Sequence, residues 1–175
     1  MLIVNNHATN YGGGVYLSSY LSPKLVNVTI TGNSANVGGG IYFNGDGEYM
    51  SVVNSIVWNN TPNIDYELGW LSFTWSNIQG GWEGAGNIDS DPLFVDPDNG
   101  DYHLSDYSPA IGAGTTDGAP DTDIEGNPRP NPEGSNPDIG AYENALGEQV
   151  HNSFIYVTTT GNDEGSFGFE SAPFA

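Results

Sequence analysis

The sequence contains no cysteine and very few basic residues, and these two absences exclude several classes of protein. Without cysteine the chain forms neither a disulfide framework nor a thiolate metal site. Its Lys and Arg residues number 2 against 22 Asp and Glu, which gives a formal charge of −20. A nucleic-acid binder needs basic side chains for phosphate contacts, and an anionic membrane surface would repel so acidic a chain. We therefore expect neither nucleic acid nor a membrane as a partner.

Long hydrophobic runs are also lacking, since no stretch approaches the roughly 18 apolar residues of a membrane span. We expect no membrane insertion. The chain is nevertheless not a disordered acidic one, because 37% hydrophobic and 12% aromatic residues suffice to bury a core. It is rich in Asn and has 25 Gly, and both residues tolerate left-handed turn conformations. This composition favours turns and short strands over helices.

An internal repeat near the N-terminus is the most informative feature. Residues 4–17 recur as residues 30–43, and the triple glycine, the Asn before it and the apolar-Tyr-apolar triad after it align at one offset of 26. At this offset His7 aligns with Asn33. Residues 26–30 recur less clearly as 53–57, and we expect residues 71–78 to begin a fourth copy.

Each copy has the alternation of a β-strand. Val28 and Ile30, and then Ile41 and Phe43, are apolar at every second position, with no period near 3.6. One such unit cannot close a core, whereas units stacked about 4.8 Å apart can, each strand pairing with its equivalent in the next unit. The sequence therefore predicts an all-β right-handed parallel β-helix, a solenoid of about three to four coils, over residues 1–80.

Two polar features of the repeat have competing explanations. Asn33 and Asn60 are equivalent at an offset of 27 and would stack as an internal amide ladder, although the ordinary turn preference of Asn explains the same positions. The triple glycines at 12–14 and 38–40 are followed by strand-like residues and by no Lys, so they indicate tight corners rather than a phosphate-binding loop.

After residue 80 the repeat stops and a different module, residues 81–145, begins around denser Pro, Asp and Gly. Its segments are GGWEGAGNIDSDPLFVD (80–96), GDYHL (100–104), SPAIGAG (108–114), DTDIEGNPRP (121–130) and PDIGAYE (137–143). Together they resemble the C-terminal module of bacterial secreted and surface β-helix proteins, the choice-of-anchor Q group. The triple-glycine coils are similar to polymorphic outer-membrane β-helix repeats. This resemblance implies a right-handed β-helix with an irregular C-terminal module, and an extracellular or cell-surface location, but no single activity.

The trailing region, residues 146–175, is out of place. Its sequence IYVTTTGND (155–163) looks like the segment that usually opens such proteins, before the first coil. Either the chain is an excerpt of a tandem array, or this capping strand is donated to a neighbouring subunit. An uncapped solenoid end invites strand addition, and a repeated head-to-tail contact gives a filament. The assembly residues would be Leu2, Ile3 and Val4 of the acceptor and Ile155, Tyr156 and Val157 of the donor.

An acidic loop in the module is a candidate calcium site. The ligands would be Asp117, Asp121, Asp123 and Glu125, because hard oxygen ligands in a flexible acidic loop suit Ca²⁺. The spacing is not that of an EF-hand, since Glu133 falls one residue beyond the closing position. Turn capping, with Asp121 or Asp123 paired to Arg129, is the alternative explanation.

Carbohydrate chemistry is the main competing function. Trp82, in a Gly-rich loop, is the best exposed candidate for stacking on a sugar ring, although a lid over the end of the core is the favoured explanation for this residue. A lyase needs a strong base, and the chain offers only Lys24 and Arg129. A hydrolase needs carboxylates that project together, and no repeat register aligns those of residues 1–80.

We therefore predict a non-enzymatic, extracellular structural or adhesive protein whose partners are copies of itself in a head-to-tail polymer. The alternative is a portion of a carbohydrate-active or carbohydrate-binding β-helix protein, a lyase or hydrolase, with glycans as partners. No cofactor is expected apart from Ca²⁺.

Overall fold

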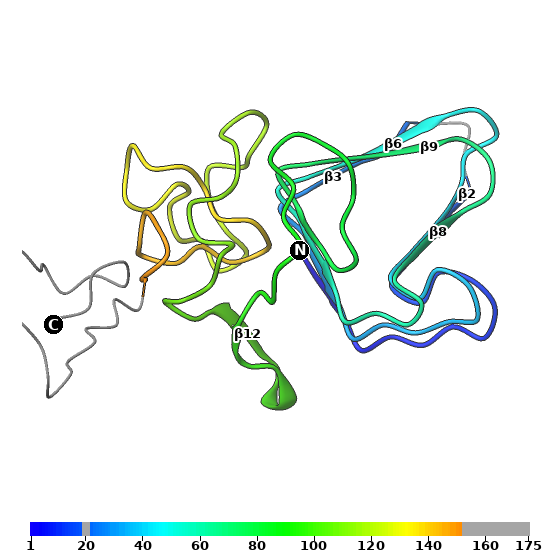
Figure 1. The fold of residues 1–175 in the computed structure, drawn as a ribbon, viewed down its shortest axis with the longest axis horizontal. Helices are drawn as coiled ribbons and strands as arrows, with labels where there is room; N and C mark the ends of the chain where they lie inside the picture. The colour runs from blue at the N-terminus through cyan, green and yellow to red at the C-terminus, as the bar shows by residue number, and fades with distance from the viewer. Residues whose placement is uncertain (19–21, 152–175) are drawn as a thin grey trace, which may run out of the picture.

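The computed structural model describes residues 1–18 and 22–151, and Figure 1 shows two parts side by side, a set of stacked strands and a loop-rich module. In the described residues the regular elements are β-strands and one short 3₁₀ helix, η1 (Pro97–Asn99), without any α-helix. No helix in these ranges is long and apolar enough to cross a membrane. The prediction of an all-β chain is confirmed.

Within the described ranges, ten strands form three parallel sheets. The β1 sheet contains β1 (Leu2–Val4), β4 (Thr29–Thr31), β7 (Ile56–Trp58) and β10 (Asn77–Ile78). The β2 sheet contains β2 (Val15–Ser18), β5 (Ile41–Asn44) and β8 (Ile64–Tyr66). The β3 sheet contains β3 (Lys24–Val26), β6 (Tyr49–Val53) and β9 (Trp70–Thr74). The three sheets form the sides of a triangular outline in Figure 1.

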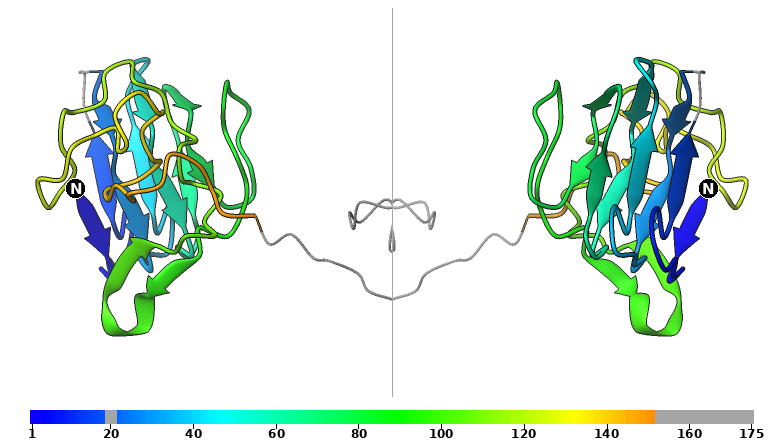
Figure 2. Two further views of the ribbon diagram at one scale, coloured as in Figure 1. Left: turned by 90° about the vertical axis from the view of Figure 1, so that its left-hand side faces the viewer. Right: turned by 90° about the vertical axis from the view of Figure 1, so that its right-hand side faces the viewer.

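The chain visits the three sheets in the same order each time, and we call each visit to all three a pass. The first pass is β1–β3, the second β4–β6 and the third β7–β9, and β10 begins a fourth. Figure 2 shows the strands of successive passes side by side, running from blue to green. The repeat in the sequence is thus a repeat in space, as predicted, with each strand paired to its equivalent.

The pairing register shows where the repeat length changes. Leu17 pairs with Phe43 in the β2 sheet, which matches the offset of 26, whereas Ile3 pairs with Ile30 in the β1 sheet, an offset of 27. The prediction that His7 lies opposite Asn33 is therefore wrong, since His7 bridges to Ser34. The passes differ in length at their corners, so one offset cannot describe all three sheets.

Alternate residues of each strand fill the interior of the stack. Ile30 and Phe43 point into this interior and are fully buried, whereas the side chains next to them in the strand point outward. The buried interior cluster consists of Val28, Ile30, Ile41, Phe43, Met50, Val52, Val57, Phe73 and Ile78. All three sheets contribute side chains to this apolar core, so residues from successive passes line it together.

The corners use residues that accept a left-handed backbone. Asn27 and Asn54 occupy equivalent corners, each with a φ of 50°. The triple glycines form tight corners, as expected, because a Cβ on Gly39 would collide with the backbone oxygen of Thr61 in the next pass.

The C-terminal module lies beside the β1 sheet rather than on an end of the stack (Figure 1). It contains one antiparallel hairpin, β11 (Phe94–Asp96) and β12 (Asp101–Leu104), followed by loops. Ile56, on the outward face of β7, packs into a second apolar cluster with Leu104, Ala110, Ile111 and Ile139. Two corner side chains bind the module directly, because Asn27 Nδ2 donates to the Asp138 carbonyl (3.0 Å) and Asn54 Nδ2 to the Thr115 carbonyl (2.7 Å).

Candidate assembly surface and other candidate sites

The first pass leaves one end of the stack unpartnered within the described residues. β1, β2 and β3 are each the terminal strand of their sheet, so each presents backbone N–H and C=O groups on one edge. The inward side chains of this pass are only partly buried, whereas Ile30 and Phe43 of the second pass are 0% exposed. The partly buried inward residues are Ile3, Val15, Leu17 and Leu25.

The predicted acceptor residues Leu2, Ile3 and Val4 all lie on this edge, as strand β1. Ile3 faces the apolar interior. Leu2 and Val4 face outward, and they pair with Thr29 and Thr31 of β4. The predicted donor residues Ile155, Tyr156 and Val157 lie outside the described residues, as does the rest of the trailing region beyond residue 151.

An amide ladder runs along the interior at one corner, which confirms the prediction for Asn33 and Asn60. The backbone N–H of Asn33 donates to Asn60 Oδ1 (2.9 Å), and Asn33 Nδ2 donates to the same oxygen (3.0 Å). The backbone N–H and Nδ2 of Asn6 donate in the same way to Asn33 Oδ1, each at 2.9 Å. Asn6 is therefore the first rung.

Sequence reasoning missed Asn6, although a signal was present. At the offset of 27 that joins Asn33 to Asn60, Asn6 aligns with Asn33, whereas the offset of 26 taken from the triple glycine points to His7. In the described residues Asn6 Oδ1 accepts no hydrogen bond, and the residue is exposed. The ladder thus ends at the open edge with an unused acceptor.

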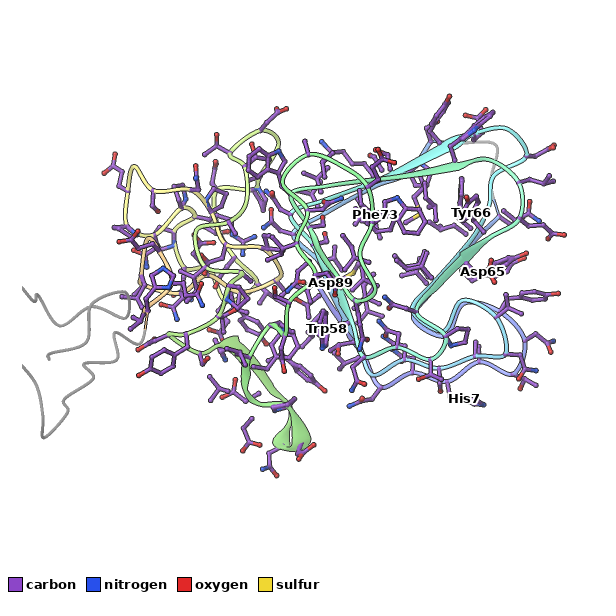
Figure 3. The ribbon with its side chains drawn as sticks, viewed as in Figure 1. His7, Trp58, Asp65, Tyr66, Phe73 and Asp89 are labelled. Carbon is purple, nitrogen blue, oxygen red and sulfur yellow. The ribbon has the colours of Figure 1, made fainter. Side chains whose placement is uncertain are left out.

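At the other end of the stack, where β8 and β9 are the terminal strands of their sheets, the loop of residues 79–90 lies over part of the interior. Trp82 is half-buried, and its ring lies 4.8 Å from that of Phe73 and 6.2 Å from that of Tyr66, centroid to centroid. Figure 3 places Phe73 and Tyr66 inside the triangular outline. The loop is closed by a hydrogen bond from the Gly80 N–H to Asp89 Oδ1 (3.1 Å). Trp82 is therefore a lid over the core, and its ring is engaged by aromatic neighbours.

The four predicted calcium ligands are not brought together. Both carboxylate oxygens of Asp123 accept backbone hydrogen bonds: Oδ1 accepts the N–H of Glu125 in its own turn (2.8 Å), and Oδ2 accepts the N–H of Glu143 from a later segment (3.1 Å). Burial acts to raise the pKa of Asp123, but hydrogen bonds from Asn127, Glu143 and Glu125 lower it overall. Glu125 bonds to His103, and Asp117 and Asp121 are exposed. In residues 1–18 and 22–151 no three acidic or His side chains are placed to hold a metal ion.

The expected pairing of Arg129 with Asp121 or Asp123 is wrong. Arg129 Nε donates to Glu143 Oε2 at 2.7 Å, and the two side chains are 1% and 0% exposed. Beside this pair, Asp138 accepts the N–H groups of Gly112 (2.8 Å) and Asn144 (2.6 Å), and burial raises its pKa to about 7. Since these groups are enclosed by their own module, we assign them to its stability.

The carboxylates of the passes also serve separate local contacts. Glu67 Oε2 accepts the hydroxyl of Tyr42 (2.7 Å), which raises the pKa of that hydroxyl to about 12. Glu48 Oε2 accepts the hydroxyl of Ser22 (2.9 Å). Each of these two carboxylates therefore binds a hydroxyl group of the preceding pass.

A hollow of about 310 Å³ opens where β4 and β7 end against the start of the module. Its lining residues are Thr31, Trp58, Asn59, Asp91, Leu93, Phe94 and Pro97. Trp58 provides a half-buried aromatic face (Figure 3), and Asp91 Oδ1 fixes the opposite wall by accepting the N–H of Leu93 (2.9 Å). Leu93 has a φ of 51°, a conformation that costs about 1 kcal/mol or more for a residue with a Cβ. Sequence reasoning did not single out this groove, because its two walls come from distant segments.

Comparison with known proteins adds no relative. No family model, no curated protein and no solved structure matches the chain. The resemblance to β-helix proteins with a choice-of-anchor Q module therefore stays a prediction that rests on the sequence motifs.

Proposed function

We propose that this chain is a non-enzymatic structural protein that assembles head-to-tail through the open end of its first pass. In this proposal the three passes are coils of a right-handed parallel β-helix, since connections between parallel strands are right-handed in about 98% of cases. The observation that carries the proposal is the asymmetry of the stack. At the first-pass end three strand edges are unpaired around partly buried Ile3 and Leu17, whereas at the other end the edges of β8 and β9 are accompanied by Trp82, which packs over Phe73.

The lid decides how two copies would join. Because Trp82 of the loop of residues 79–90 packs over Phe73 of the last pass, the first pass of a neighbour would meet this loop if it stacked there directly. A strand donated from the trailing region avoids this obstacle. Figure 2 shows the first pass at one end of the stack and the last described residues (orange) leaving at the other. A donor that leaves one end and binds the opposite end of the next copy repeats without closing, which gives a filament.

The charge of the chain supports assembly at this end rather than elsewhere. With 22 acidic residues against 2 basic ones, the surfaces of two copies repel each other. The inward residues of the first pass are apolar, so burial there is favourable. We therefore expect polymer formation to increase with salt, which screens the repulsion. An extracellular or cell-surface location is proposed from the sequence resemblance.

The experiment combines electron microscopy with light scattering on the full chain, a deletion of residues 154–175 and Ile3→Asp. The full chain should form filaments, and both variants should remain monomeric with an unchanged β circular dichroism spectrum. Tyr49→Asp is the matched control, because Tyr49 is 57% exposed on the second pass, and it should polymerise normally. Polymers that persist in the deletion variant would refute strand donation.

The groove beside Trp58 supports a second candidate, binding of a neutral sugar. Its hollow combines an aromatic face with the carboxylate of Asp91 and the amide of Asn59, which suits hydroxyl groups and one pyranose ring. In NMR titrations with glucose, galactose and mannose to about 50 mM, the Trp58 indole signal should shift. Asp91→Asn should weaken the shift, and Asp89→Asn, in the lid loop, should not. No shift with any of these sugars would eliminate this candidate.

A further inference from the structure

The trailing region carries a copy of the β4 strand motif. Residues 157–162 read VTTTGN, and residues 28–33, which contain β4 (Thr29–Thr31), read VTITGN, so five of six residues are identical. β4 pairs in parallel with β1, the edge strand of the first pass. The chain therefore contains a second segment with the sequence that this sheet uses as a neighbour of β1.

We infer that Val157–Asn162 of a second copy pairs with the free edge of β1, and that Asn162 becomes the next rung of the ladder formed by Asn6, Asn33 and Asn60. This inference rests on the proposed head-to-tail assembly and specifies its register. Thr159 lies opposite Ile3 and Thr160 opposite Val4, the register of one pass on the next.

The hydrogen bonds of the ladder explain why Asn162 fits. Each rung accepts, through Oδ1, the backbone N–H of the rung one pass earlier, as Asn60 does from Asn33 and Asn33 from Asn6. Asn33 Nδ2 also donates to the Ile3 carbonyl (2.9 Å), and Asn60 Nδ2 to the Ile30 carbonyl (2.9 Å), again one pass earlier. Asn6 is left with an unused Oδ1, and the N–H and Nδ2 of Asn162 supply its donors.

The residue before each rung lies at a corner with a left-handed backbone, and this requirement selects the same register. Asn5, Gly32 and Asn59 precede the three rungs, and their φ values are 54°, 69° and 53°. In the inferred register Gly161 takes this position, which suits a left-handed backbone. If Tyr156 lay opposite Ile3 instead, Thr158 would take the corner and Thr159 the rung. A β-branched residue is strongly disfavoured at positive φ, so that register is rejected.

The absence of cysteine makes the register directly measurable by disulfide cross-linking. Two single variants, Val4→Cys and Thr160→Cys, are mixed under oxidising conditions and should give a disulfide-linked pair, because facing residues lie within the reach of a disulfide. The matched control mixes Val4→Cys with Val157→Cys, which face each other only in the rejected register. Preferential linkage of the control pair would overturn the inference while leaving assembly intact.

A second measurement tests the rung itself. Asn162→Leu should raise the concentration needed for assembly about 10-fold or more, because it leaves buried donors and acceptors of the ladder unpaired. Asn152→Leu, in the same trailing region, should have no effect. Filaments that form equally well with Asn162→Leu would overturn the rung alone.

An unmutated chain that stays monomeric at all concentrations and salt levels would overturn the proposed function as well. Cross-linking within one monomer of the double variant Val4→Cys/Thr160→Cys would refute the second copy as the occupant.

Discussion

The stacked passes and the C-terminal module exclude water from their interiors with different chemical groups. The passes bury Ile, Val and Phe side chains around a ladder of neutral amides. The module has a small apolar cluster beside the β1 sheet and a buried ionic pair, Arg129 with Glu143, next to Asp138. The amide ladder repeats from pass to pass, whereas the ionic pair occurs once and its two side chains are each other's partners.

This difference bears on how each part can grow. A ladder in which every rung uses groups of the next always ends with unused groups, and here the end at Asn6 lies beside an unpaired strand edge. The buried polar groups of the module, by contrast, have their partners inside the module, since Glu143 pairs with Arg129 and Asp138 accepts the N–H groups of Gly112 and Asn144. Extension is therefore expected at the passes and not at the module.

The largest effect that separates the two parts should follow from Arg129→Leu. Removing one partner of a buried ion pair leaves Glu143 charged and unpaired, which costs about 3–5 kcal/mol. Unfolding in urea would measure the loss. Low pH should restore part of the stability of the variant, because protonated Glu143 no longer needs a cation, and the absence of such a rescue would contradict the assignment.

Equivalent isoleucines in two passes provide a sharper comparison. Ile3 and Ile30 face each other in register, but Ile30 is 0% exposed and Ile3 is only partly buried. Ile30→Ala should cost about 2–5 kcal/mol and Ile3→Ala about 1–2 kcal/mol in the dilute monomer. Under conditions of assembly the cost of Ile3→Ala should approach that of Ile30→Ala. Equal losses in the monomer would mean that the first pass is already covered.

The sequence predicted the passes well because a stacked repeat records its contacts in its own periodicity. Leu17 pairs with Phe43 and Asn33 bonds to Asn60, as the alignment indicates. The third copy was faint for a physical reason. Ile41 pairs with Ile64, an offset of 23, because the corner before β8 has no triple glycine and the pass is shorter.

The module could not be predicted in the same way, since its contacts have no period. Arg129 has several acidic residues near it in sequence, and spacing alone does not select Glu143 over Asp121 or Asp123. The apparent calcium loop failed to converge because Asp123 binds the backbone of its own turn, a local contact that an acidic cluster does not reveal. The groove at Trp58 likewise depends on two segments that meet only in the folded chain.

The smallest predicted effect concerns His103, which joins β12 to the loop of residues 121–127. Its Nδ1 lies 2.6 Å from Asp101 Oδ1 and its Nε2 3.1 Å from Glu125 Oε2. Partial burial acts to lower the pKa of His103, but the hydrogen bonds to Glu125 and Asp101 raise it overall. A raised pKa means that the folded state binds the proton more tightly, so the stabilisation is complete below about pH 6.5 and is lost as the pH rises through the folded pKa.

Because the groups around His103 are partly exposed, solvent screens the pair and the loss should not exceed about 1 kcal/mol. The melting temperature should therefore fall slightly between about pH 6 and pH 8, and His103→Gln should remove this part of the fall. Asp138, whose pKa burial raises to about 7, gives a slope of the same sign in both proteins, so the difference between them isolates the imidazole. Parallel curves for the two proteins would show that the pKa of His103 is the same in the folded and unfolded states, which would contradict this assignment. The module would then owe its pH dependence to buried carboxyl groups, in contrast to the buried interior cluster of the passes, which consists of apolar side chains.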